Sequence, residues 1–192
     1  MLDNTHFNSP AVLKDIEAET QAIGFTLSSD QLTGTLLRTL AASKPGGKLL
    51  ELGTGTGMGT TWILDGMNAT ATLSTVDRDA DVAALARKHL RNDTRVTFHN
   101  TDARLFIAAQ QEGSFDFVFA DTPYGKFHML DETLKLLKSG GLYIVDDMLP
   151  LPDTEPSHFD RINRLVETLE QRTDLRITKL NWSTGIILAA KI

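Results

Sequence analysis

Short apolar runs alternate with amphipathic segments along most of the chain. Runs long enough for buried strands occur at 49–52, 72–76, 96–98, 115–120 and 142–145, and apolar residues at helical spacing fill the segments between them. This alternation is typical of an open parallel sheet with helices on both faces. Two last apolar runs, 175–180 and 185–190, are joined by the short connection 181–184. They predict a hairpin, which forces one strand to be antiparallel. We therefore expect an α/β sheet of about seven strands with one reversed.

Capping residues and turn residues set the expected helix boundaries. The first helix is predicted to begin at Ser9 and Pro10 and to end at Gly24, with Val12, Ile16 and Ile23 on one face. A second is predicted from Ser28 or Ser29 to the stop at 44–47, with leucines at 32, 36 and 40 facing the core. Further helices are expected at 60–66, 79–90, 103–109, 130–137 (stopped by Gly140 and Gly141) and 159–169.

Length and composition narrow the class of protein. The 192 residues are most simply one domain, 1–192, whose first 47 residues supply two leading helices. The net charge of −6 disfavours a nucleic-acid backbone as the main partner. There is no cysteine, hence no disulfide framework, and no apolar run approaches the roughly 20 residues that span a bilayer. The N-terminal residues lack a secretory pattern. We expect a cytoplasmic protein without membrane partners.

A glycine-rich segment, KLLELGTGTGMGT at 48–60, carries the clearest chemical signal. It predicts a buried strand, a tight turn and a helix start, in which glycines let a ligand lie against backbone N–H groups. Asp77 ends the next apolar run, 20 residues after Gly57. In doubly wound sheets an acid at this place binds ribose hydroxyls. The glycine spacing, G-x-G-x-G, departs from the G-x-G-x-x-G of dinucleotide-binding turns, which disfavours a dehydrogenase.

With Glu51 before the turn, ELGTGTG resembles the cofactor loop of class I S-adenosylmethionine-dependent methyltransferases. The resemblance implies a Rossmann-like methyltransferase sandwich, with the leading helices covering the active-site mouth. It also implies S-adenosyl-L-methionine as cofactor. The residues expected to bind it are Glu51, Gly53, Thr54, Gly55, Gly57, Asp77, Arg78, Asp102, Ala103 and Asp121.

Two of the expected ligands have structural alternatives. Asp77 is read as the ribose ligand, with Asp79 as the cap of the following helix. Asp102 resembles the residue that faces the adenine amino group in this superfamily, and it is equally suited to cap helix 103–109. The two roles of Asp102 are compatible.

A more specific resemblance covers nearly the whole chain. The chain follows the order of elements in catechol-type O-methyltransferases. The matching parts are the two leading helices and the segments LLELGTGTG, VDRDADVAAL, FDFVFADTPYGKF, GGLYIVDDML and WSTGIILAAK. That family implies Mg²⁺ or Ca²⁺ held at the positions of Asp121, Asp146 and Asp147, and three carboxylates suit such a cation. Asp147 stands where the family has asparagine, and Tyr124 stands where it has its lysine base. The catalytic candidates are Asp121, Tyr124 and the out-of-register Lys126.

The expected activity is O-methylation of a small hydroxylated, catechol-like substrate, with metal assistance left open. Asp121-Thr122-Pro123-Tyr124 also resembles the D/N-P-P-Y/F signature of amino-group methyltransferases that act on nucleobases. A non-catalytic S-adenosylmethionine-binding protein is a third reading. The sequence leaves the acceptor open; its contacts are expected from the leading helices, the 122–128 loop and the 149–156 loop. It leaves the oligomeric state open too, although relatives with this architecture are frequently homodimers.

Overall fold

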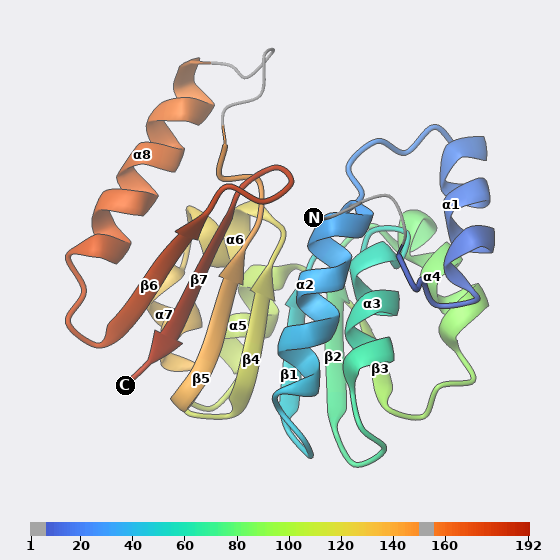
Figure 1. Ribbon diagram of the computed structural model, residues 1–192, viewed down its shortest axis with the longest axis horizontal. Helices are drawn as coiled ribbons and strands as arrows, with labels where there is room; N and C mark the ends of the chain where they lie inside the picture. The colour runs from blue at the N-terminus through green and yellow to red at the C-terminus, as the bar shows by residue number, and fades with distance from the viewer. Residues whose placement is uncertain (1–6, 150–155) are drawn as a thin grey trace.

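The computed structural model describes residues 7–149 and 156–192, and their strands form one twisted sheet (Figure 1). The strand order is β3-β2-β1-β4-β5-β7-β6. Every pair from β3 to β5 is parallel, whereas β7 runs antiparallel to both β5 and β6. The strands are β1 (Lys48–Leu52), β2 (Thr72–Asp77), β3 (Val96–Asn100), β4 (Phe115–Ala120), β5 (Leu137–Val145), β6 (Leu175–Leu180) and β7 (Ile186–Lys191). The predicted sheet with one reversed strand is confirmed.

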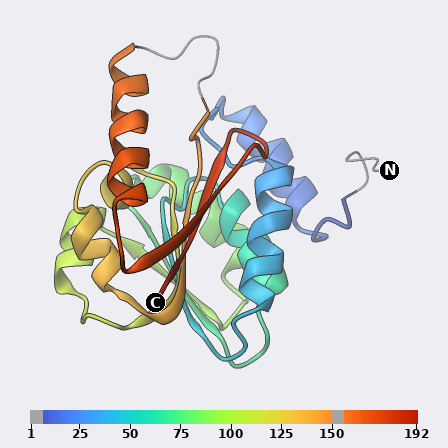
Figure 2. The same ribbon diagram turned by 60° about the vertical axis from the view of Figure 1, so that its left-hand side comes forward.

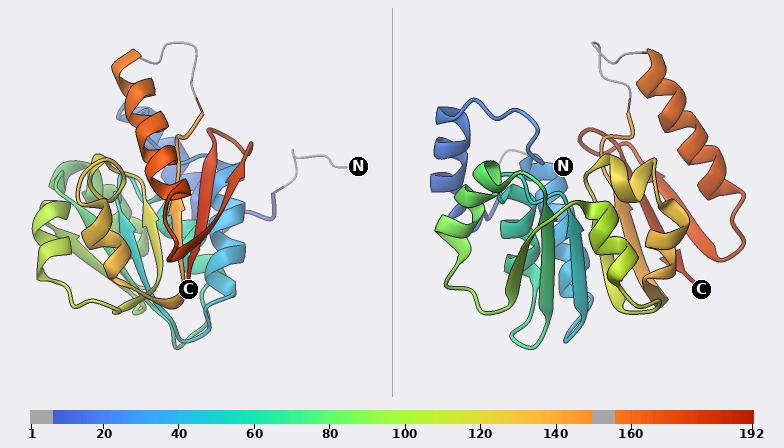
Figure 3. Two further views of the ribbon diagram at one scale, coloured as in Figure 1. Left: turned by 90° about the vertical axis from the view of Figure 1, so that its left-hand side faces the viewer. Right: turned by 180° about the vertical axis from the view of Figure 1, so that it is seen from behind.

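Helices cover both faces of this sheet. They are α1 (Leu13–Ala22), α2 (Gln31–Ala42), α3 (Met58–Gly66), α4 (Ala80–Leu90), α5 (Ala103–Ala109), α6 (Pro123–Lys126), α7 (Leu130–Lys135) and α8 (Pro156–Glu170). In Figure 1, α2 and α3 lie in front of the strands, and the view from behind in Figure 3 brings α5 and α7 forward. The result is a three-layer sandwich.

Alternation along the central strands supplies an apolar core on each side. Leu49 belongs to an apolar cluster that includes residues of helices α1–α4, whereas Leu50 and Leu52 belong to a second cluster that includes residues of α5, α7 and α8. In β4, Phe117 and Phe119 join the first cluster, and Val118 joins the second. A strand buried on both faces reads as a continuous apolar run, which is why the sequence marked β1 and β4 so clearly.

The two leading helices begin later than expected. Helix α1 starts at Leu13 without a side-chain cap, so the prediction of a start at Ser9 and Pro10 was wrong, and Ile23 lies beyond the helix end, exposed. Helix α2 is capped by Asp30, whose carboxylate accepts from the Thr33 N–H at 2.9 Å, instead of by Ser28 or Ser29. Its buried residues are Thr33, Gly34, Leu37 and Ala41, a face next to the predicted leucine stripe.

The segment around Leu137 was also misassigned. Helix α7 ends at Lys135, and Leu137 already pairs with Phe115 in the sheet. The register shifts between Phe115 and Phe117, where Gly140 takes a φ of +77°. Gly140 and Gly141 therefore form an irregularity inside β5 and do not stop a helix.

Strands β6 and β7 close one edge of the sheet beside α8 (Figure 2). Ile162, Leu165 and Leu169 of α8 are buried, whereas Phe159, predicted on the same face, is 38% exposed. None of the helices in residues 7–149 and 156–192 combines the length and apolarity that crossing a membrane requires.

The contact between α2 and α3 generates a stability prediction. A Cβ built on Gly34 would lie 2.2 Å from Cδ1 of Trp62, and the Trp62 side chain is completely buried. Gly34→Ala gains about 1 kcal/mol in helix propensity. We nevertheless expect it to lower the free energy of unfolding by about 1–3 kcal/mol, because the overpacked ring cannot move aside freely. Urea unfolding measures the change.

A matched pair at the exposed Thr39 in the same helix isolates the propensity contribution. Thr39→Ala should be more stable than Thr39→Gly, the opposite order to Ala and Gly at position 34. A Gly34→Ala protein as stable as the wild type would show that the Trp62 packing is looser than described.

Candidate functional site

A pocket lies at the carboxyl ends of β1, β2 and β4, and the glycine turn after β1 forms its floor. Gly53, Gly55 and Gly57 have φ values of +108°, +52° and +95°. A Cβ on Gly53 would lie 2.8 Å from the Asp121 carbonyl oxygen, and one on Gly57 would lie 2.7 Å from Cβ of Ala86. Glycine is therefore required for the backbone conformation and also for the close approach of β4 and α4.

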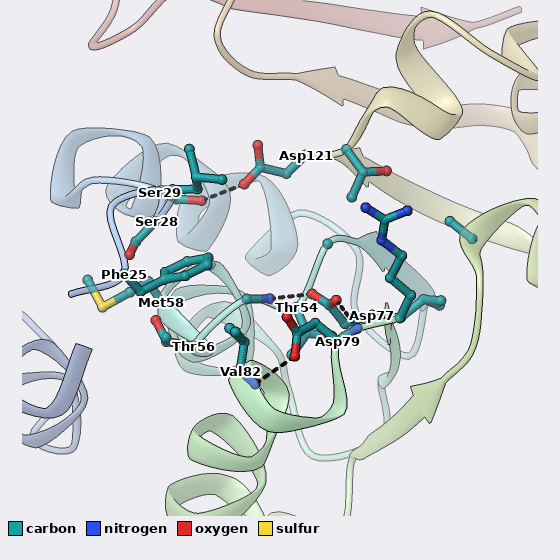
Figure 4. Close-up of a pocket in the computed structure, with 18 of the residues that line it drawn as sticks. Phe25, Ser28, Ser29, Thr54, Thr56, Met58, Asp77, Asp79, Val82 and Asp121 are labelled. Carbon is teal, nitrogen blue, oxygen red and sulfur yellow. Dashed lines mark hydrogen bonds between the residues drawn. The ribbon is translucent and has the colours of Figure 1, made fainter. Parts of the chain in front are cut away.

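Asp77 fastens this turn to the end of β2 (Figure 4). Its Oδ2 accepts from the Gly55 N–H at 2.8 Å, and its Oδ1 accepts from the Asp79 N–H at 2.9 Å. Asp79 in turn accepts from the N–H groups of Asp81 and Val82, so it caps α4 as predicted. Asp77 is half-buried and lines the pocket with carboxylate lone pairs still available.

Glu51 lies beneath the turn, completely buried. Its Oε2 accepts from Thr60 Oγ1 and, at 2.6 Å, from Thr75 Oγ1. Burial raises the pKa of Glu51 to about 8, more than these hydrogen bonds lower it, and the charges of Asp121 and Asp77 raise it further. A carboxyl with this pKa is mostly protonated at pH 7, and a positive charge brought next to it would favour its ionised form.

Asp102 caps helix α5, which is one of its two expected roles, and it also lines the pocket. The cap is a 2.7 Å hydrogen bond from the Arg104 N–H, and the neighbouring Ala103 lines the pocket as well. Arg78 lines the same side. Thr56 Oγ1 is buried and has no hydrogen-bond partner among the described residues. An unpaired buried hydroxyl in a pocket wall is a group that a bound ligand can satisfy.

The segment between α1 and α2 covers the pocket. Phe25, Leu27 and Ser28 line it, and Leu27 is 81% exposed. Ser29 Oγ donates to Asp121 Oδ2 at 3.1 Å, which joins this segment to the end of β4 (Figure 4). The sequence carried no motif here; only the general expectation that the leading helices cover the mouth pointed to it.

Asp121, which follows β4, also lines the pocket. Burial raises its pKa to about 7; Lys126 opposes this shift, whereas Asp146 and Asp147 add to it. Tyr124 lines the pocket two residues after Thr122, and its ring lies 5.4 Å from that of His128. Met58 lines the pocket, whereas Trp62 is packed entirely in the core.

The acids predicted to hold a metal are arranged differently from a metal site. Asp146 is buried, and its Oδ1 already accepts from Thr184 Oγ1 at 2.6 Å and from the Asp147 N–H at 2.8 Å. Lys126, 6% exposed, places Nζ 3.7 Å from both Asp121 Oδ1 and Asp147 Oδ2. Across residues 7–149 and 156–192, no three Asp, Glu, His or Cys side chains are grouped to hold a metal ion. These residues do not fit the implied Mg²⁺ or Ca²⁺.

The structure thus brings together most of the predicted site. The predicted cofactor residues that line the pocket are Gly53, Thr54, Gly55, Asp77, Arg78, Asp102, Ala103 and Asp121. Five of the predicted site residues are not part of the pocket lining: Glu51, Gly57, Lys126, Asp146 and Asp147. The expected contribution of the 149–156 loop falls largely on residues 150–155, outside the described residues.

Comparison of the whole chain with solved structures shows the same fold. A Corynebacterium glutamicum protein superposes with a TM-score of 0.85 at 20% identity, covering 97% of this chain and 92% of that one. An O-methyltransferase from Bacillus cereus in complex with SAH (S-adenosylhomocysteine) gives 0.84 at 20% identity, covering 98% and 94%. TomG, an O-methyltransferase from Streptomyces achromogenes solved with SAM, gives 0.81 at 22% identity, covering 97% and 92%.

Sequence comparison identifies relatives of the central region. A Mycobacterium tuberculosis protein named a probable O-methyltransferase is 31% identical over 117 residues, which cover 58% of this chain and 52% of that protein. The chain thus spans about half the length of the curated relatives it matches. The sequence model of a family described as a methyltransferase domain matches residues 50–148, from β1 to just past β5, about half of the chain. The chain belongs to this methyltransferase-domain family.

Proposed function

We propose that the chain is an S-adenosylmethionine-dependent O-methyltransferase that acts on a small hydroxylated molecule. The observation that carries the proposal is the pocket in which the glycine turn, Asp77 and Asp102 meet at the carboxyl ends of the parallel strands. Ligands of open α/β sheets bind at this edge. The curated relatives bear the name O-methyltransferase, which supports transfer to oxygen and does not favour the amino-group alternative.

The residues of the pocket fit this cofactor. Asp77 would accept from the ribose hydroxyls, the 53–57 backbone would lie against the amino-acid part, and Asp102 with Ala103 would border the adenine. The orphaned Thr56 hydroxyl offers a further hydrogen bond. The bound ligand would carry a sulfonium and an ammonium, and these charges would favour the ionised forms of Asp121 and Glu51, whose pKa values burial raises.

Catalysis in this proposal depends mainly on positioning. When bound, S-adenosylmethionine supplies an electrophilic methyl group. Asp121 and Tyr124 line the side of the pocket next to the Lys126 ammonium. We assign these three residues to orient the acceptor hydroxyl, to receive its proton and to stabilise the negative charge that develops on its oxygen. Phe25 and Leu27 would exclude water from above. No step is assigned to a divalent metal, because the carboxylates do not fit one.

Turnover is the direct test. Incubation with methyl-labelled S-adenosylmethionine and a panel of catechols and other phenols should give a methyl ether of at least one acceptor. Label found only in tRNA, rRNA or DNA would favour the amino-group reading instead. Tight cofactor binding without turnover on either panel would favour the non-catalytic reading.

The role of Asp77 yields a binding prediction. Asp77→Asn should raise the dissociation constant for S-adenosylhomocysteine about 10- to 100-fold, because a charged acceptor is worth about 1.5–3 kcal/mol. Isothermal titration calorimetry measures this. Asp65→Asn, which removes a carboxylate that pairs with Arg38 at the surface, is the matched control and should bind as the wild type does. Equal affinity of the wild type and both variants would show that Asp77 does not contribute to cofactor binding.

Glu51 yields a proton-linkage prediction. The bound cation should lower the raised pKa of Glu51, so that binding near pH 7 releases part of a proton. Titrations in phosphate and in Tris, which differ in ionisation enthalpy, should give different apparent heats for S-adenosylmethionine. The difference in heat between the two buffers should be smaller for S-adenosylhomocysteine, whose thioether sulfur carries no charge. It should also be smaller for the Glu51→Gln variant. Identical heats in both buffers would contradict the predicted linkage.

A further inference from the structure

Lys126 occupies an unusual position for a lysine. It follows Gly125, which takes a φ of +89° and whose Cβ, if present, would lie 2.6 Å from Cδ1 of Leu52. The carbonyl of Gly125 also accepts a hydrogen bond from the buried Tyr143 hydroxyl. The 123–128 loop is therefore pressed onto the ends of β1 and β5. This packing leaves the Lys126 side chain only 6% exposed, beneath the rim of the sheet.

The ammonium lies between two carboxylates from different strand ends. Its distances to Asp121 Oδ1, after β4, and to Asp147 Oδ2, after β5, are both 3.7 Å. A buried ammonium is stable only where opposite charge compensates its lost hydration. Asp147 holds its place with a left-handed φ of +59°, and its N–H donates to the neighbouring Asp146. The chain itself therefore supplies a cation to Asp121 and Asp147, which together we call the Asp121–Asp147 rim.

This place is the one that a divalent ion would need. Carboxylate oxygens bind Mg²⁺ or Ca²⁺ at about 2.0–2.6 Å, so an ion shared by Asp121 and Asp147 would have to lie between them. The ammonium already lies there, and like charges repel strongly at such short range. Asp146 offers at most its Oδ2 to such an ion, because its Oδ1 already accepts from Thr184 and from the Asp147 N–H.

We propose that the Lys126 ammonium is the resident cation of the Asp121–Asp147 rim and makes the site independent of divalent metals. At 3.7 Å neither carboxylate takes a hydrogen bond from Nζ, so its N–H groups remain able to donate to an oxygen entering beside Asp121. In the proposed transfer, on which this last role rests, the acceptor hydroxyl gives its proton to the Asp121 carboxylate while its oxygen bonds to the sulfonium methyl group; the electron pair of the broken S–C bond stays on sulfur, and S-adenosylhomocysteine leaves. Lys126 donates a hydrogen bond to the acceptor oxygen beside Asp121 and stabilises its developing negative charge. Lys126 is then a catalytic residue that acts as a tethered cation.

The experiment follows Mn²⁺ by electron paramagnetic resonance, since bound ion loses the sharp signal of free ion. Wild-type protein treated with EDTA and then dialysed should leave the signal of roughly stoichiometric Mn²⁺ unchanged. Lys126→Met removes the ammonium, keeps the apolar stem and should take up about one Mn²⁺ per chain. Lys126→Arg keeps the charge and should take up none.

Lys138→Met is the matched control. It removes a lysine that pairs with Asp116 at 2.7 Å at the opposite, amino-terminal end of β4, and it should take up no Mn²⁺. Circular dichroism verifies that each variant is folded. Stoichiometric Mn²⁺ uptake by the wild type, displaced by Mg²⁺, overturns the proposal even if no variant folds. A folded Lys126→Met that binds no Mn²⁺ overturns it as well.

Cofactor binding separates this inference from the proposed function. Calorimetry with S-adenosylhomocysteine on the same metal-free samples reports only on the pocket. Absence of binding there contradicts the proposed function, whatever the Mn²⁺ result. If the transfer is found, its rate should change less than twofold between EDTA and added Mg²⁺, and Lys126→Met should lower kcat at least tenfold while the affinity for S-adenosylhomocysteine stays within about threefold. A wild-type rate that depends on Mg²⁺ contradicts the inference.

Discussion

The structure depends on the close packing of one backbone turn, which follows β1 and contains three glycines in the left-handed conformation, against the ends of the neighbouring strands. The N–H groups of Gly53 and Thr54 both donate to the Val76 carbonyl, and the Gly55 N–H donates to Asp77. Below the turn, Glu51 holds β1, β2 and α3 together through Thr75 and Thr60. Any Cβ on Gly53 would collide with the end of β4. The same geometry that forces glycine here also brings the backbone of the turn to the wall of the pocket.

This constraint explains why the core of the fold was predictable. A turn between two buried parallel strands needs apolar runs on both sides and glycines between them, and all of these are written locally in the chain. The five parallel strands, the presence of one reversed strand in the closing hairpin and the caps at Asp79 and Asp102 were predicted correctly for that reason. The errors came where tertiary packing decides. Helix α2 turns Gly34 and Leu37 inward because Trp62 needs room, and no periodicity in the segment indicates this.

The residues of the candidate site also fall into two groups, those that the sequence could predict and those that it could not. Residues next to strand ends, such as Asp77, Asp102 and Asp121, could be placed on one rim by topology alone. Phe25 and Ser29 could not, because they belong to a loop between two helices without any motif, and only the folded chain brings them to the pocket, where Ser29 contacts Asp121. Lys126 is an intermediate case. Its distance in sequence from Asp121 departs from the family pattern, yet the turn at Gly125 returns its ammonium to the rim.

The glycine turn, Asp77 and Asp102 thus form one side of the pocket, and Asp121 with the neighbouring Lys126 ammonium forms the other. The most direct measurement of this account is a ¹H–¹⁵N NMR titration of the protein with S-adenosylhomocysteine. The account predicts saturable shifts concentrated at the amides of Gly53, Gly55 and Gly57 and at Asp77 and Asp102. Shifts confined to the β6–β7 edge, or a spectrum that does not change, would contradict it.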